Sequence, residues 1–197
     1  YELVESMGLK PSLLYGGMIE HQQNQAMVKA LEIPARRLIL DWEVNDVLKE
    51  SDVVITVDFH RPGANNILPD DCVPHIVIDH HASEGVAADL SMVHPEFSAT
   101  SSLVASMLMG LDFEMTPRVA TALAFGIRTD TLGFTRHFNP VDIRALSWLN
   151  AWVDSTMLRS IEEPPRSRET LEAFAEALRE RQQVGTTLIA PLSSLPN

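Results

Sequence analysis

The chain has 197 residues, which is enough for one domain with a substantial core and a small additional segment. Its net charge of −12, from 15 basic and 27 acidic residues, repels phosphate groups at long range and disfavours long nucleic acid as the main partner. No apolar run approaches the ~20 residues that cross a bilayer, and no signal segment opens the chain. We therefore expect a cytoplasmic protein that has no membrane partner.

Cys72 is the only cysteine, which excludes an internal disulfide and a cysteine-based zinc cluster. It follows Asp70 and Asp71, and nearby carboxylates raise the pKa of a thiol instead of lowering it. We therefore interpret Cys72 as an incidental residue and not as a catalytic thiol.

Taken in chain order, the sequence alternates apolar runs with amphipathic segments. Strands are expected at residues 13–15, 37–40, 53–57 and 75–78, and helices at residues 1–7, 21–31, 43–50, 99–110, 117–128 and 140–153. Asn139 is the expected cap of the last of these helices, with Pro140 in its first turn. Because the strands are apolar on both faces and are separated by helices, we predict an α/β fold, a mostly parallel sheet with helices on both faces.

A linker and a connector helix are expected to follow, over residues 162–185. The linker candidate contains Pro164 and Pro165. Ser167 is then expected to cap a polar, amphipathic helix that runs to about Gln183.

Both ends of the chain resemble cuts in a longer protein. No capping residue precedes Tyr1, so residues 1–161 are expected to form a main domain that lacks its first part. Residues 186–190 resemble a strand that enters a new unit, and we expect residues 186–197 to begin a further C-terminal domain.

Two carboxylates follow apolar strands directly. Asp58 comes after the run 53–57, and Asp79 comes after the run 75–78. In open α/β sheets, ligands bind at the carboxyl ends of parallel strands, although either residue alone would also fit a loop-capping role. Asp79 is followed by His80 and His81, and a carboxylate beside two imidazoles suits a divalent metal. Two solvent-facing histidines are the alternative interpretation of this tripeptide.

A third polar group ends the helix that begins near Pro117. Asp130 follows largely apolar sequence and needs a partner there, and a metal ion would be one. Arg128 is interpreted as a structural counter-ion to a carboxylate.

These segments, in this order and spacing, resemble the DHH phosphoesterase family over nearly the whole chain. The family includes RecJ-type single-strand exonucleases, nano-RNases, cyclic-dinucleotide phosphodiesterases and family II inorganic pyrophosphatases. The matching segments are Tyr15-Gly16-Gly17 with His21-Gln22-Gln23-Asn24, Val57-Asp58 with Pro62-Gly63-Ala64-Asn65-Asn66, Ile78-Asp79-His80-His81, Ser98-Ala99-Thr100-Ser101, and Gly126 to Thr131.

The resemblance implies a role for each site residue. Asp58 would bridge two Mn²⁺ or Mg²⁺ ions, and His80 and Asp130 would complete the second metal site. His81 would face the substrate phosphate, and Asp79 would hold the histidines in orientation. A water or hydroxide between the two metals would attack phosphorus in line.

The sequence departs from the family at both ends. The family's first motif, of the type His-x-Asn-Pro-Asp-x-Asp, is expected upstream of residue 1, and its C-terminal substrate-binding domain is missing. His21 and His60 lack the spacing of that motif and are interpreted as surface or loop residues. As a fragment, the chain is expected to bind metal weakly and to have little activity.

The resemblance implies a phosphodiester or phosphate-ester substrate, such as a short oligonucleotide or a cyclic dinucleotide. Asn65-Asn66 and the residues after them are more similar to the nano-RNase branch than to the pyrophosphatases. The alternative is a non-catalytic module of the same fold that binds a nucleotide or metal and regulates a partner. The substrate, the physiological metal and the oligomeric state, with a homodimer as one option, stay open.

Overall fold

The computed structural model describes residues 1–63, 66–83, 85–111 and 113–192. Ala64 and Asn65, which belong to the expected second motif, and residues 193–197 of the expected C-terminal start lie outside these described residues. The chain divides into two compact units, Tyr1–Glu162 and Glu163–Asn197.

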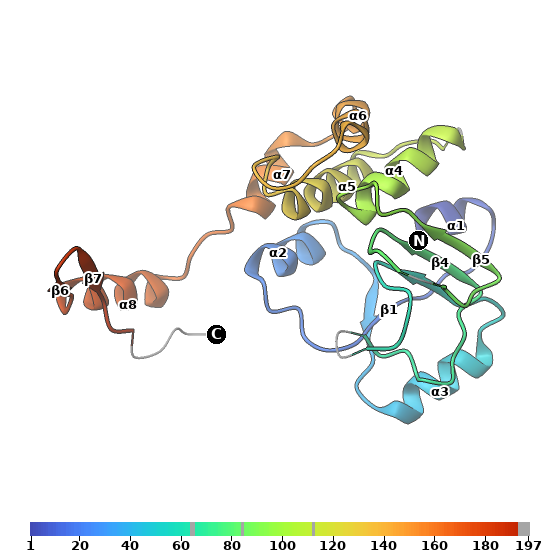
Figure 1. Cartoon of the computed structure of the whole chain (residues 1–197), viewed down its shortest axis with the longest axis horizontal. Coiled ribbons are helices and arrows are strands. Elements are labelled where there is room, and N and C mark those ends of the chain that lie inside the picture. The colour runs from blue at the N-terminus through green and yellow to red at the C-terminus, as the bar shows by residue number, and fades with distance from the viewer. Residues whose placement is uncertain (64–65, 84, 112, 193–197) are drawn as a thin grey trace. The chain divides into compact units, whose positions relative to one another are not determined.

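The first unit contains parallel strands and the helices that accompany them (Figure 1). Its elements are α1 (Glu2–Ser6), β1 (Leu13–Tyr15), α2 (Gln22–Ala30), β2 (Ala35–Arg37), α3 (Asp41–Glu50), β3 (Ile55–Val57), β4 (Ile76–Asp79), β5 (Leu90–Val93), α4 (Thr100–Gly110), α5 (Pro117–Asp130), α6 (Pro140–Leu149) and α7 (Ser155–Glu162). β1 pairs with β2, and β3, β4 and β5 form a second sheet in that order; all of these pairs are parallel. The predicted α/β class is confirmed. No described helix is long and apolar enough to cross a membrane.

β3 begins two residues later than the expected strand 53–57, and β4 is displaced by one residue from 75–78. The strands depart from the prediction in three larger respects. They form two sheets instead of one continuous sheet. The second strand lies at Ala35–Arg37 and not at 37–40, because the chain turns into α3 at Leu40, where backbone N–H groups bond Glu43. β5 is absent from the prediction because its Leu-Ser-Met-Val sequence is short and its first two residues are exposed, so it lacks a long apolar run.

The core lies among α4, α5 and α6. Alanines 105, 120 and 145 are fully buried there beside Ile127 and Leu149. Small side chains let helices approach closely, and a closely packed interior has little room for an added atom. α5 begins where Thr116 Oγ1 accepts a hydrogen bond from Val119 N–H, with Pro117 at the first position. α4 contacts β4, so this helical layer lies directly on the three-stranded sheet.

A second cluster fixes α2 and α7 against α5. Leu31, Phe125 and Ile161 are its buried members. α7 is absent from the prediction, which extended the preceding helix to residue 153. In the structure α6 ends at Leu149, and the Asp154 carboxylate starts a new helix by accepting hydrogen bonds from the N–H groups of Thr156 and Met157.

The second unit contains α8 (Arg168–Arg179), β6 (Gln182–Val184) and β7 (Thr187–Ile189). Ser167 caps α8 as predicted, since its hydroxyl accepts a hydrogen bond from Thr170 N–H. The helix ends at Arg179 and not near 183, because β6 and β7 pair as an antiparallel hairpin. Gly185 makes its tight turn with a left-handed φ of 62°.

Candidate metal centre

The carboxyl ends of β3 and β4 bring Asp58 and Asp79 to the same edge of the sheet. The two strands pair in parallel with Val57 opposite Ile78, and Asp58 N–H donates to Ile78 O at 2.9 Å. Asp58, which follows β3, and Asp79, the last residue of β4, therefore lie at neighbouring strand ends.

Asp58 has an unusual backbone conformation, with φ at 71°. Asp and Asn adopt this left-handed region more readily than most residues, although it is strained for any residue other than Gly. Thr100, at the start of α4, donates its hydroxyl to Asp58 Oδ1 at 2.6 Å. The Asp58 side chain is 57% exposed, and this hydrogen bond fixes the direction of its carboxylate.

His80 and His81 lie beside Asp58. One ligand atom from each of the three residues lies within 4.8 Å of the others, as a shared cation would require. His80 Nε2 lies 3.7 Å from Asp58 Oδ1. Its other ring nitrogen, Nδ1, lies 3.2 Å from Phe97 O and donates to that carbonyl, which leaves the Nε2 lone pair facing Asp58.

Asp79 is fully buried directly beneath the two histidines. Its Oδ1 accepts hydrogen bonds from His81 Nδ1 at 2.7 Å and from the backbone N–H groups of His80 and His81. Burial raises the pKa of Asp79, but hydrogen bonds from His60 and His81 outweigh this and hold the pKa below its usual value. The geometry refines the expectation for Asp79: it orients the ring of His81, whereas Phe97 orients the ring of His80.

Asp130 lies at the end of α5 and acts electrostatically on the same group of residues. Burial raises the pKa of the Asp130 carboxyl, and the negative charge of Asp58 raises it further, against the opposing effects of His80, His81 and Arg136. Asp130 does not belong to the close trio of Asp58, His80 and His81 among the described residues. It contributes a second carboxylate near the trio and not a fourth member of it.

The electrostatics of this cluster favour a cation. The hydrogen bond to Asp79 raises the pKa of His81, burial opposes this, and the charges of Asp79, Asp58 and Asp130 raise it further. Carboxylate oxygens together with imidazole nitrogens form a donor set that suits a divalent cation. The residues present therefore fit a divalent cation at this position.

His60 lies in the loop after β3, which agrees with the loop part of its interpretation as a surface or loop residue, but it is not a surface residue. Its Nδ1 lies 2.5 Å from Asp79 Oδ2, and its side chain is only 12% exposed. His21, which received the same interpretation, is exposed as predicted. The sequence distinguishes the two residues only by position, because His60 lies two residues beyond Asp58.

The prediction also missed Asp142, which fixes the segment before α4. This fully buried carboxylate accepts hydrogen bonds from the backbone N–H groups of Ser98 and Asn139, at 3.1 and 2.8 Å. Asp142 therefore fixes the turn that delivers Thr100 to Asp58. An acidic residue three positions after the predicted cap Asn139 is the signal that could have identified it.

Arg128 forms an ion pair with Glu162 through both oxygens of the carboxylate. The interpretation of Arg128 as a structural counter-ion is confirmed, and the pair connects α5 to the end of α7. Bidentate pairs of this kind restrict geometry more than single contacts do.

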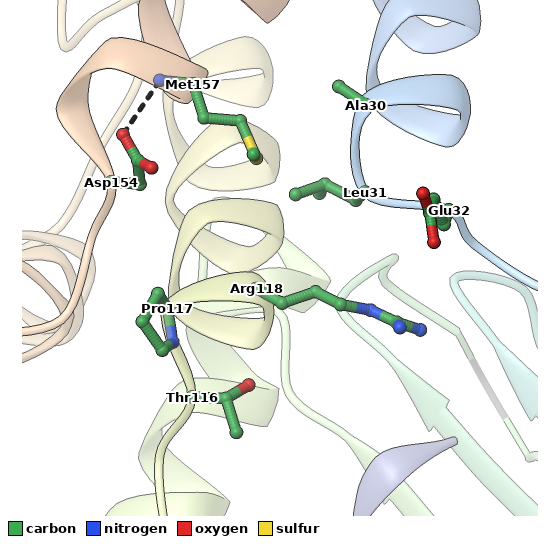
Figure 2. A pocket seen from close by; sticks show the side chains of 8 residues that line it. All are labelled: Ala30, Leu31, Glu32, Thr116, Pro117, Arg118, Asp154 and Met157. Atoms are coloured by element: carbon green, nitrogen blue, oxygen red, sulfur yellow. Dashed lines mark hydrogen bonds between the residues drawn. The ribbon is translucent and has the colours of Figure 1, made fainter.

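A mainly apolar pocket of about 340 Å³ lies away from the centre (Figure 2). Leu31 and Met157 face it from α2 and α7, and Pro117 and Arg118 line it at the beginning of α5. Asp130 ends the same 14-residue helix, so the pocket and the centre lie near opposite ends of a rod of about 20 Å. The pocket is therefore not part of the metal centre.

Replacement of Cys72 by Ser is expected to change little. Burial raises the pKa of the Cys72 thiol, and the charge of Asp71 raises it further, so the thiol is a poor nucleophile at neutral pH. Cys72→Ser should leave metal affinity unchanged and shift the free energy of unfolding by less than about 1 kcal/mol. Urea denaturation and metal titration would measure this, and a large loss of metal affinity would contradict it.

Together, the parallel sheet and the Asp–His cluster at its strand ends define an α/β protein with a candidate cation site of mixed oxygen and nitrogen donors. A family model described as "DHH family, N-terminal domain" matches residues 13–127, which is more than half of the chain. The chain therefore belongs to the DHH family. Membership suggests a phosphoesterase type of function that depends on metal.

Two further proteins are similar to this chain, one in sequence and one in fold. An uncharacterized protein of Methanocaldococcus jannaschii is 33% identical over 198 residues, which cover 99% of this chain and 40% of that protein. The chain thus spans less than half the length of this relative. A crystal structure of an exopolyphosphatase-related protein from Bacteroides fragilis is similar in fold, with a TM-score of 0.60 and 16% identity over 93% of this chain and 65% of that one.

Proposed function

We propose that this chain provides the metal-binding residues of a phosphoesterase that hydrolyses phosphodiester or phosphate-ester bonds with the aid of two divalent cations, Mn²⁺ or Mg²⁺. One observation carries the proposal: Asp58, His80 and His81 converge to within 4.8 Å at the ends of neighbouring parallel strands. Family membership suggests phosphoesterase chemistry for this cluster. Asp130 is a second carboxylate nearby, and a bound cation would stabilise its ionised form against the burial and the charge of Asp58 that raise its pKa.

The proposed roles follow the positions of the side chains. Asp58 would bridge the cations, and His80 Nε2 and Asp130 would be ligands of one of them. The bound cations would supply an activated water and neutralise charge on the phosphoryl oxygens. His81 would contact the substrate phosphate, because its Nδ1 is held by Asp79 while the ring is 54% exposed. Asp79 would fix that ring and the turn that carries both histidines.

The proposed substrates are small phosphate esters, namely short oligonucleotides or cyclic dinucleotides, as in the nano-RNase-like and RecJ-like branches. The net charge of −12 supports small substrates over long nucleic acid, since the long-range field repels a polyanion. A short substrate can instead be held by local contacts with bound cations. The alternative is a regulatory module that binds metal or nucleotide without turnover.

The test is hydrolysis by the full-length protein, since the Methanocaldococcus jannaschii relative is longer than this chain. A short oligoribonucleotide, a cyclic dinucleotide and inorganic pyrophosphate would each be incubated with Mn²⁺ or Mg²⁺, and the products separated by chromatography. We expect turnover of one of the two nucleotide substrates, loss of turnover on chelation, and recovery on addition of Mn²⁺.

The outcomes separate the two functions. Tight Mn²⁺ binding without turnover of any nucleotide would favour the regulatory module. Absence of Mn²⁺ and Mg²⁺ binding would refute the phosphoesterase and the metal-binding module, and nucleotide binding without metal would then favour the nucleotide-binding form of the regulatory module.

A further inference from the structure

We propose that His60 is a positioning residue of the metal centre, which couples the turn that carries Asp58 to the turn that carries His80 and His81. The inference rests on the proposed function, because it concerns the same centre. His60 does not contact the trio directly, so any effect on the metal must pass through Asp79.

The contacts of Asp79 divide between its two oxygens. Oδ1 accepts hydrogen bonds from His81 Nδ1 and from the backbone of the turn after β4. Among the residues that the structure describes, Oδ2 accepts a bond from His60 alone, at 2.5 Å. A fully buried carboxylate that loses the partner of one oxygen bears an uncompensated desolvation penalty. His60 is thus required to keep the side chain of Asp79 in place.

The position of His60 in the chain extends this effect to Asp58. Only Phe59 separates His60 from Asp58, whose strained φ of 71° must be held by its surroundings. Thr100 restrains the side chain of Asp58, and the bond between His60 and Asp79 restrains the backbone on its C-terminal side. His60, Asp79 and His81 therefore form one hydrogen-bonded series that sets the separation of the β3 and β4 turns.

The contact of His60 through Nδ1 distinguishes between variants that can and cannot replace it. His60 contacts Asp79 through Nδ1, which the side-chain amide of Asn can imitate in position and as a donor. The amide of Gln instead reaches the position of Nε2. His60→Asn should therefore retain the coupling, whereas His60→Ala and His60→Gln should lose it. His21→Ala is the matched control, because His21 is exposed and outside the centre.

The experiment measures Mn²⁺ affinity by calorimetry and the absorption spectrum of bound Co²⁺ in the full-length protein. We expect His60→Ala and His60→Gln to bind Mn²⁺ about 10- to 100-fold more weakly, the range found for residues that orient metal ligands. Their Co²⁺ spectra should be altered, since the ligand geometry relaxes. His60→Asn and His21→Ala should resemble the wild type in both measurements.

Three results would contradict either the inference or the proposed function, and one further comparison covers a folding failure of His60→Ala. Wild-type affinity and spectrum in His60→Ala would overturn the inference while leaving the proposed function intact. Equal loss in His60→Asn and His60→Ala would also overturn it, because it would make His60 itself a ligand. If His60→Ala fails to fold, His60→Gln against His60→Asn provides the same comparison. Absence of Mn²⁺ binding by the wild type would refute the proposed function itself.

Discussion

Replacement of Asp58 by Asn in the full-length protein is expected to abolish metal-dependent hydrolysis, with a loss of more than about 100-fold. Removal of a residue that only orients a ligand already costs about 10- to 100-fold, and Asp58 is proposed to be the bridging ligand itself. Asn tolerates the left-handed backbone at this position, and its amide oxygen can still accept the Thr100 hydroxyl. The variant therefore removes little besides the negative charge. Mn²⁺-dependent cleavage of a short oligoribonucleotide measures the loss.

A matched control separates this effect from a general loss of charge. Asp46 lies on the exposed face of α3 and pairs with Lys49 at 3.8 Å, so Asp46→Asn should leave activity unchanged. His80→Ala should reproduce the loss seen in Asp58→Asn, because its Nε2 faces the same carboxylate. Wild-type activity in a folded Asp58→Asn variant would refute the assigned role of Asp58.

Replacement of Gly126 by Ala is expected to destabilise the fold by about 1–3 kcal/mol. A Cβ at this position would lie 2.1 Å from Ser101 Oγ and 3.0 Å from Ser101 Cβ, so the Ser101 side chain, or the two helices α4 and α5, would have to shift. These two helices carry Thr100 and Asp130, so a shift of the helices would also weaken metal binding. The midpoint of urea denaturation would give the loss of stability.

Two further variants test the packing explanation. Gly110→Ala, also in a helix, meets no atom within 4 Å and should be neutral or slightly stabilising. Ser101→Ala combined with Gly126→Ala removes the hydroxyl from the contact and should recover part of the lost stability. A wild-type denaturation midpoint in Gly126→Ala would show that the α4–α5 contact tolerates a methyl group and would contradict the prediction.

The elements with strong local signals could be predicted from the sequence. Residues 13–15 form β1 as predicted, and Pro117 and Pro140 begin helices that match the expected starts. β5 and α7 could not be predicted in this way. β5 becomes a strand because Leu90–Val93 can pair with β4, and α7 begins where Asp154 supplies a cap that interrupts an apolar pattern.

The candidate site divides in a similar way. Strand-end position and motif resemblance point to Asp58, Asp79, His80, His81 and Asp130, and their assigned roles stay predictions until they are tested. The bond between His60 and Asp79 could not be predicted, because the two residues lie 19 positions apart and their pairing depends on the register of β3 against β4. The bond between Thr100 and Asp58, 42 residues apart, depends on how α4 lies on the sheet.

By itself, the sequence determined that this protein is an α/β protein of the DHH type with carboxylates and imidazoles at strand ends. The fold class and the strand-end positions follow from hydrophobic periodicity and from residue types at short spacing, which local interactions control, whereas the DHH family came from the resemblance of the motifs. Only the tertiary structure decided that His60 bonds to Asp79 while His21 stays exposed, and that Ser101 lies against Gly126. Such facts depend on contacts between distant segments, which close packing fixes only after the chain has folded.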